Sequence, residues 1–252
     1  MIQTPLHWEN PTANLDMFTH KLMSISSQPD LIVLPEMFST GFSMNPEKFA
    51  EQMDGTSVNW LRSMAGRLGC VITGSLIIVE NGQFFNRLVW MDPEGNFQVY
   101  DKRHLFSLAG EEKYYEPGKE RLIVTLKGFR IMPLICYDLR FPVWSRNDLN
   151  YDLVIYVANW PERRSFFWSQ LLVARAIENQ SYVIGVNRVG QDGNHFSHTG
   201  DSVCLGPLGN VISKAVPGRE EIIFATIRKS EIETVQSKFR FLNDSDSFSI
   251  TI

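Results

Sequence analysis

The sequence predicts an α/β protein whose sheets mix parallel and antiparallel strands. Short apolar runs rich in β-forming residues recur along the 252 residues, helical patterns lie between them in the first and middle thirds, and turn signals separate neighbouring strands. No internal repeat, low-complexity segment or Gly/Ser/Pro-rich linker divides the chain. We therefore expect one domain that spans residues 1–252.

Most of the predicted strands are nearly continuous apolar runs, which is typical of strands covered on both faces or stacked on a second sheet. They occupy residues 31–34, 70–79, 87–91, 122–126, 129–136, 153–158, 182–189, 202–205 and 222–227. A last short strand is expected at 248–252, after a solvated acidic turn. Only Ile2 and Gln3 precede Thr4 and Pro5, which is too little for a full strand. Either the sheet lacks a strand there or the natural chain starts earlier.

Helical periodicity and turn chemistry complete the pattern. The expected helices occupy residues 14–26, 58–68 and 166–179. In the first of them, apolar side chains recur every three or four residues and form one stripe, made of Leu15, Phe18, Leu22 and Ile25. Hairpin turns are expected at Asn81-Gly82, at residues 93–95 and at residues 207–209.

Composition excludes several classes of protein. The net charge of −4 gives no indication of a basic surface for nucleic acid. No apolar run approaches the roughly 18 residues of a membrane helix. The first ten residues lack the layout of a signal peptide. Cys70, Cys136 and Cys204 form no CxxC pair, so neither a disulfide framework nor a thiolate zinc site is expected. These features favour a reduced, cytoplasmic protein that binds neither nucleic acid nor membrane.

Three residues whose side chains could take part in catalysis follow predicted strands. Glu36 comes directly after the run 31–34 and Pro35, Cys136 ends the run 129–136, and Lys102 follows a strand after the turn at 93–95. A carboxylate partly removed from water can act as a base, an exposed thiol as a nucleophile, and a fixed lysine can stabilise an oxyanion. Each residue taken alone is better explained by a structural role, as a solvated glutamate, a core cysteine or a surface lysine.

Together these residues resemble one family. Leu-Pro-Glu36, Asp-Lys102-Arg-His-Leu-Phe and Ile-Cys136-Tyr-Asp-Leu-Arg-Phe-Pro, in this order, resemble the Glu-Lys-Cys signature of the nitrilase, or carbon–nitrogen hydrolase, superfamily. Residues 157–161, 174–183 and 200–202 are similar to segments that follow the cysteine in that superfamily. Within it, the motifs are most similar to those of bacterial ω-amidases (2-oxoglutaramate amidases). The resemblance implies a four-layer α-β-β-α sandwich that forms a homodimer.

The resemblance also implies a reaction without metal or organic cofactor. Cys136 attacks the carbonyl carbon of a small amide and forms a thioester, while Glu36 acts as base and acid. Lys102 and the backbone N–H of Tyr137 hold the oxyanion. A second glutamate of the family site precedes a Pro-Gly pair, and spacing back from Pro117 matches it to Glu111 rather than to the nearby acids, Glu112 and Glu116.

The residues around the substrate are less defined by the sequence. Phe42, Phe106 and Trp160 lie beside the matched motifs and are expected as apolar walls, although core positions suit them equally. An arginine is expected to hold a substrate carboxylate, and four are available: Arg140, Arg163, Arg164 and Arg175. Arg140 and Arg175 are expected instead to form ion pairs with Asp138 or Glu178.

Alternative functions remain open at this point. A nitrilase, a carbamoylase or an aliphatic amidase would carry the same three residues, and a non-catalytic binding protein could use the same fold. The pair His195 and His198 has the spacing of metal ligands but lies on a polar loop, so we expect no metal there. His104 is expected to support the loop that carries Lys102.

Overall fold

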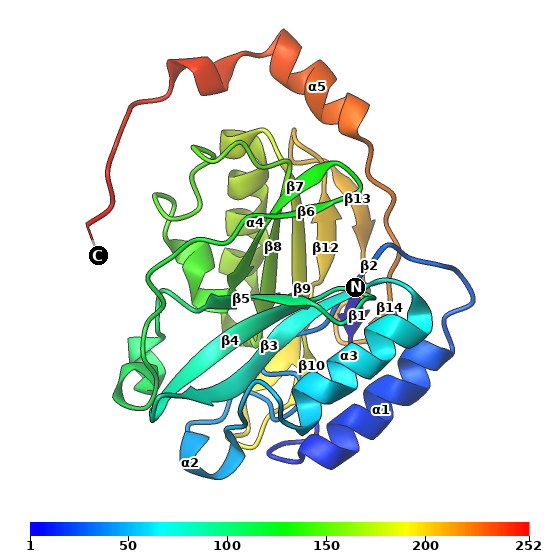
Figure 1. Cartoon of the computed structure of the whole chain (residues 1–252). Helices are drawn as coiled ribbons and strands as arrows, with labels where there is room; N and C mark the ends of the chain where they lie inside the picture. The colour runs from blue at the N-terminus through cyan, green and yellow to red at the C-terminus, as the bar shows by residue number, and fades with distance from the viewer. Residues whose placement is uncertain (252) are drawn as a thin grey trace.

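The computed structural model describes residues 1–251, which fold around two sheets (Figure 1). A four-stranded sheet has the order β2 (Leu31–Val33), β3 (Val71–Glu80), β4 (Gln83–Met91) and β5 (Phe97–Asp101). A six-stranded sheet has the order β13 (Val211–Lys214), β12 (Val203–Leu205), β9 (Tyr182–Asn187), β8 (Leu153–Ala158), β7 (Phe129–Ile135) and β6 (Val124–Leu126). Two short ladders pair β1 (Ile2–Gln3) with β14 (Glu221–Ile222), and β10 (Val189–Gln191) with β11 (Ser197–Thr199).

Helices cover the outer face of each sheet. In Figure 1, α1 (Pro11–Met23) and α3 (Thr56–Leu68) lie side by side, and α3 packs on β3 and β4 of the four-stranded sheet. On the other side, α4 (Ser165–Asn179) packs on β9 and β12. The order helix, sheet, sheet, helix confirms the predicted four-layer α/β fold. Two further helices, α2 (Pro46–Phe49) and α5 (Lys229–Lys238), lie outside these layers.

The strands are continuous apolar runs because both of their faces are buried. Along β4, Leu88 and Trp90 belong to the core between the two sheets, whereas Val89 and Met91 belong to the core under α1 and α3. Alternate side chains point to opposite faces of a strand, so a strand between two apolar layers needs apolar residues at successive positions.

Both sheets mix strand directions, as expected from the sequence. β2 runs parallel to β3, and β7, β8 and β9 run parallel to one another, while the remaining neighbours are antiparallel. The three predicted hairpin turns connect β3 to β4, β4 to β5 and β12 to β13.

The ends of the chain differ from the prediction. At the N-terminus, Ile2 and Gln3 form a two-residue strand that pairs with Glu221 and Ile222, so the predicted strand 222–227 is reduced to this short ladder. Residues 248–251 form no strand, and Ile252 lies outside the described residues. The helix α5 was not predicted because its sequence is mostly polar and only its Ile232 and Val235 are buried.

One helix start and one strand also differ. The first helix begins at Pro11, since the Asn10 side chain accepts a hydrogen bond from the Ala13 N–H and proline suits the first turn. The predicted strand 182–189 divides into β9 and β10. After β7, a 3₁₀ turn, η3 (Cys136–Arg140), begins at the cysteine itself. Within residues 1–251, no helix has the length and apolar content to cross a membrane.

Candidate active site

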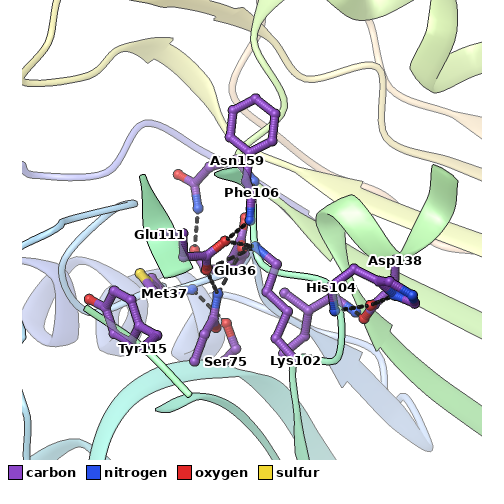
Figure 2. A network of polar contacts seen from close by, with 12 residues as sticks. Glu36, Met37, Ser75, Lys102, His104, Phe106, Glu111, Tyr115, Asp138 and Asn159 are labelled. Atoms are coloured by element: carbon purple, nitrogen blue, oxygen red, sulfur yellow. Dashed lines mark hydrogen bonds and ion pairs between the residues drawn. The ribbon is translucent and has the colours of Figure 1, made fainter. Parts of the chain in front are cut away.

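Glu36 is completely buried where the chain leaves β2. One of its carboxylate oxygens accepts hydrogen bonds from Lys102 Nζ at 2.8 Å and Asn86 Nδ2 at 2.9 Å, and the other accepts the Asn159 N–H at 2.8 Å (Figure 2). The next peptide is held as well, because the Met37 N–H donates to Ser75 Oγ at 2.8 Å. The turn after β2 therefore presents one fixed carboxylate between the two sheets.

Lys102 enters the site from the end of β5. Its backbone N–H donates to the Asn86 carbonyl at 2.9 Å, which continues the β4–β5 ladder by one pair beyond Arg87 and Asp101. Residues paired across a ladder lie on the same face of the sheet, so the Asn86 and Lys102 side chains both point between the sheets. This register explains how a lysine with no exposed surface reaches two carboxylates.

Glu111 completes the cluster and is also fully buried. Its carboxylate receives Lys102 Nζ at 3.0 and 2.9 Å, the Phe106 N–H at 2.6 Å and Asn86 Nδ2 at 3.2 Å. The alternatives, Glu112 and Glu116, are exposed. All contacts of the Glu36 and Glu111 side chains come from donors, which fits two ionised carboxylates around one ammonium group.

Cys136 lies at a strained elbow between β7 and η3. Its φ of 41° is in the left-handed region, which non-glycine residues adopt only at a cost of about 1–3 kcal/mol. The elbow is held by Asp138, whose carboxylate accepts the Ile135 N–H at 3.0 Å, the Tyr100 hydroxyl at 2.7 Å and the His104 N–H at 3.0 Å. Strain that the surroundings enforce at one half-buried cysteine is characteristic of a functional position.

His104 connects the loop that carries Lys102 to the elbow at Cys136. Its ring contacts Asp138 through Nδ1 at 2.8 Å and stacks on Phe141 with 3.7 Å between ring centroids. Asp138 is therefore engaged by His104 and Tyr100 rather than by Arg140, and the predicted Arg140–Asp138 ion pair is wrong. The other predicted pair forms, because Arg175 contacts Glu178 at 2.9 Å.

The buried cluster opens onto a cavity of about 590 Å³. Glu36, Cys136, Tyr137 and Asn159 line it. The wall includes the three aromatic residues expected there, Phe42, Phe106 and Trp160. Phe42 also lies against the ammonium group of Lys102, with 5.0 Å from Nζ to the ring centroid. Three of the four candidate arginines line this cavity, namely Arg140, Arg163 and Arg164, and Arg175 does not.

Burial and neighbouring charges set the protonation of the site. Burial by itself lowers the pKa of Lys102, but the Glu111 and Glu36 carboxylates outweigh it and raise the pKa above its ordinary value. Burial raises the pKa of Glu111, and Lys102 opposes this shift. Burial, then the Glu36 carboxylate, raises the pKa of the Cys136 thiol well above its usual range. At neutral pH the site therefore holds a protonated thiol beside a carboxylate.

Two asparagines of the site had no assigned role in the sequence analysis. Asn86 donates to both carboxylates, and Asn159 donates its N–H to one Glu36 oxygen and its side-chain amide to the Glu36 carbonyl at 2.6 Å. Asn86 was detectable in principle, because it is a polar residue on the same strand face as the buried Leu88 and Trp90. Asn159 lies within a matched motif, but no spacing rule distinguishes it from a loop residue.

The two histidines of the pair lie in different surroundings. His195 is exposed, whereas His198 is buried on β11 and lines the cavity. Burial and the nearby Arg188 cation lower the pKa of His198 to about 4, so its ring is neutral at pH 7. In the part of the chain that the structure describes, no three His, Cys, Asp or Glu side chains are grouped to hold a metal ion.

Comparison with known proteins places this fold and site in a family. The model of the carbon-nitrogen hydrolase family matches residues 1–237, so the chain belongs to that family of amide-cleaving hydrolases. It is 45% identical to the ω-amidase YafV of Yersinia enterocolitica over 98% of this chain and 96% of the relative. It is 32% identical to the 2-oxoglutaramate amidase of Bacillus subtilis over 96% and 95% of the two chains.

A solved structure gives the same result. XC1258 from Xanthomonas campestris, a CN-hydrolase superfamily protein with an arsenic adduct in its active site, superposes with a TM-score of 0.96 at 42% identity. The match covers 100% of this chain and 97% of the Xanthomonas protein. The superfamily predicted from the Glu36, Lys102 and Cys136 motifs is therefore confirmed.

Proposed function

We propose that this protein is an ω-amidase. It hydrolyses the ω-amide of a small dicarboxylic acid monoamide, such as 2-oxoglutaramate or 2-oxosuccinamate, to the acid and ammonia. The observation that carries the proposal is the buried Glu36–Lys102–Glu111 cluster, whose Glu36 lines one cavity together with Cys136. The names of the Yersinia and Bacillus relatives support the choice of substrate.

Acylation begins with a protonated thiol. Because burial and Glu36 hold the pKa of Cys136 high, Sγ becomes nucleophilic only when a base removes its proton as the bond forms. Glu36 takes that proton while Sγ attacks the amide carbon, and the carbonyl oxygen becomes an oxyanion. The Lys102 ammonium group and the Tyr137 N–H, at the first turn of η3, stabilise this oxyanion.

Glu36 then transfers the proton to the leaving nitrogen. The C–N bond breaks, ammonia departs and an acyl thioester remains on Cys136. In the second half, Glu36 removes a proton from a water molecule that attacks the thioester carbon, and it returns that proton to the departing sulfur. Every proton is thus transferred by one carboxylate, whose position is fixed by Lys102, Asn86 and Asn159.

Glu111 is a positioning residue in this scheme. Its carboxylate contacts Lys102 but does not line the cavity. It balances the charge of the ammonium group and holds it at a fixed place, so that Lys102 needs little reorganisation when the oxyanion forms.

The test is ammonia release from 2-oxoglutaramate by the wild type, with Cys136→Ala as the blank. Release by the wild type and none by Cys136→Ala is expected. Ammonia from Cys136→Ala at a measurable rate contradicts the thioester scheme. If the wild type releases no ammonia while Cys136 is still alkylated faster than Cys70 and Cys204, the proposed substrate is wrong and Cys136 remains the nucleophile. Nitriles, carbamoyl amino acids and simple amides are then the next substrates to test.

Two further tests concern the base and the assembly. Glu36→Gln is expected to block acylation, and a thioester that forms in this variant at the wild-type rate removes Glu36 as the base. We also propose, from the family resemblance, a cytoplasmic homodimer. Sedimentation equilibrium of the purified protein measures its mass, and the mass of a single 28.9 kDa chain refutes the dimer.

A further inference from the structure

Three arginines of the cavity wall form no ion pair with any carboxylate in the part of the chain that the structure describes. Within residues 1–251, the arginines that form ion pairs are Arg87, Arg121 and Arg175, all of them outside the cavity. The three arginines of the cavity wall neither form ion pairs nor donate side-chain hydrogen bonds within that part of the chain; they are Arg140, Arg163 and Arg164. Their donors are therefore free for a ligand.

Besides Glu36, which contacts Lys102, two acids line the cavity, Glu9 and Asp192, and both accept hydrogen bonds from other groups. Glu9 accepts a hydrogen bond from Ser43 Oγ at 2.6 Å. Asp192 accepts the N–H groups of Asn194 and Phe196, each at 2.9 Å, within its own loop. Neither acid contacts an arginine of the wall, so the unpaired guanidinium groups have no internal anion.

Arg164 is held at its guanidinium group and at its backbone. Its guanidinium carbon lies 4.9 Å from the centroid of the Phe106 ring, and its backbone carbonyl accepts Trp160 Nε1 at 2.7 Å. Phe106 is fixed in turn, because its N–H donates to Glu111 and its ring packs edge-on against Tyr137 at 5.0 Å. A guanidinium stacked by its face keeps its N–H edge free, the edge that binds a carboxylate in bidentate fashion.

Burial distinguishes Arg164 from Arg163, which is exposed, but not from Arg140, which is half-buried as well. Arg164 is half-buried, and this burial, followed by the Arg163 charge, lowers its pKa, with Arg140 acting in the same direction. Arg163 is exposed over the Phe196 ring, and Arg140 lies between Trp160 and the exposed Phe167. Holding like charges together in a partly dry place is unfavourable unless an anion binds there.

We propose that Arg164 is the residue that binds the substrate carboxylate, at the end of the molecule opposite the scissile amide. This inference rests on the proposed ω-amidase function and names the group that selects its substrates. Lys102 and Cys136 hold the amide end, and Arg164, fixed to the same loop through Phe106, holds the acid end. Amides that carry a carboxylate are therefore preferred over neutral amides of equal length.

The test separates binding from turnover. In a Cys136→Ala background, which does not consume the amide, calorimetry measures the Kd of 2-oxoglutaramate and of pentanamide. Arg164→Gln is expected to weaken 2-oxoglutaramate binding by about 10- to 100-fold, the range for loss of charge-assisted hydrogen bonds, and to change pentanamide binding less than about threefold. Arg67→Gln, an exposed arginine of α3 outside the cavity, controls for the loss of one charge.

Each outcome bears on the inference. The inference is overturned if Arg164→Gln weakens the binding of both ligands equally or weakens neither. It is also overturned if Arg163→Gln causes the loss of about 10- to 100-fold in 2-oxoglutaramate binding while Arg164→Gln leaves that binding unchanged. If 2-oxoglutaramate does not bind to Cys136→Ala at all, the inference is also wrong. The wild-type ammonia assay reports separately on the proposed function. If Arg164 binds 2-oxoglutaramate selectively but the wild type releases no ammonia, Arg164 remains the carboxylate-binding residue and the proposed amide hydrolysis is refuted.

Discussion

Removing the ammonium group of Lys102 tests the charge balance of the site most directly. The Glu36 and Glu111 carboxylates share Lys102 Nζ at 2.8–3.0 Å with no exposed surface on any of the three side chains. The summed charge of Glu36, Glu111 and Lys102 is −1, and Lys102→Met changes it to −2. Breaking a buried ion pair from one side costs about 3–5 kcal/mol, because a charge is left without its partner.

This cost is measurable by denaturation. For a domain of this size, about 3–5 kcal/mol lowers Tm by roughly 6–20 °C. Without the ammonium group, burial and mutual repulsion raise the folded-state pKa values of the two carboxyls above their unfolded values of about 4.3. Such groups bind more protons in the folded state, so the stability of Lys102→Met falls as pH rises from 5 to 8. Urea denaturation of the wild type and the variant at both pH values tests this prediction.

A charge-balanced variant is the matched control. Lys102→Met/Glu111→Gln restores the summed charge to −1, so it is expected to recover at least about half of the lost stability and none of the activity. Activity falls by at least about 10²–10³-fold in both variants, since the oxyanion loses its cation. The reasoning is refuted if Lys102→Met unfolds within about 1 kcal/mol of the wild type. A double variant no more stable than Lys102→Met refutes it too.

Three further predictions concern neighbouring groups. The alkylation rate of Cys136 is expected to rise through pH 9 without levelling off, because burial and Glu36 raise the pKa of the thiol; a plateau below pH 8 by peptide mass spectrometry contradicts this. Asn86→Leu is expected to lower stability by about 1–3 kcal/mol and kcat at least about tenfold, since it removes a donor from two buried carboxylates; unchanged kcat removes the positioning role. Gly118→Ala is expected to lower Tm by several degrees, because an added Cβ would lie 2.0 Å from the Asp101 carbonyl oxygen, next to Lys102; a thermal melt that matches the wild type contradicts this close approach.

The layers of the fold were predictable because their signals are local. The alternation of faces along β4 and the stripe on α1 follow from periods of about two and 3.6 residues, which neighbouring residues alone determine. The elements missed were those with weak patterns, such as the polar α5 and the two-residue β1. β1 forms only because Glu221 and Ile222 come to lie beside it.

The sequence by itself determined the family and the residues that carry its motifs, Glu36, Lys102 and Cys136. Tertiary structure decided how they are held: Asn86 and Asn159 approach Glu36 from 50 and 123 residues away along the chain, a relation without any sequence period. It also separated Arg175, which pairs with Glu178, from the three arginines that line the cavity and form no ion pair within residues 1–251, Arg140, Arg163 and Arg164. The physical reason is that hydrogen bonds and charges act over a few ångströms of space, whereas sequence patterns report only on neighbours along the chain.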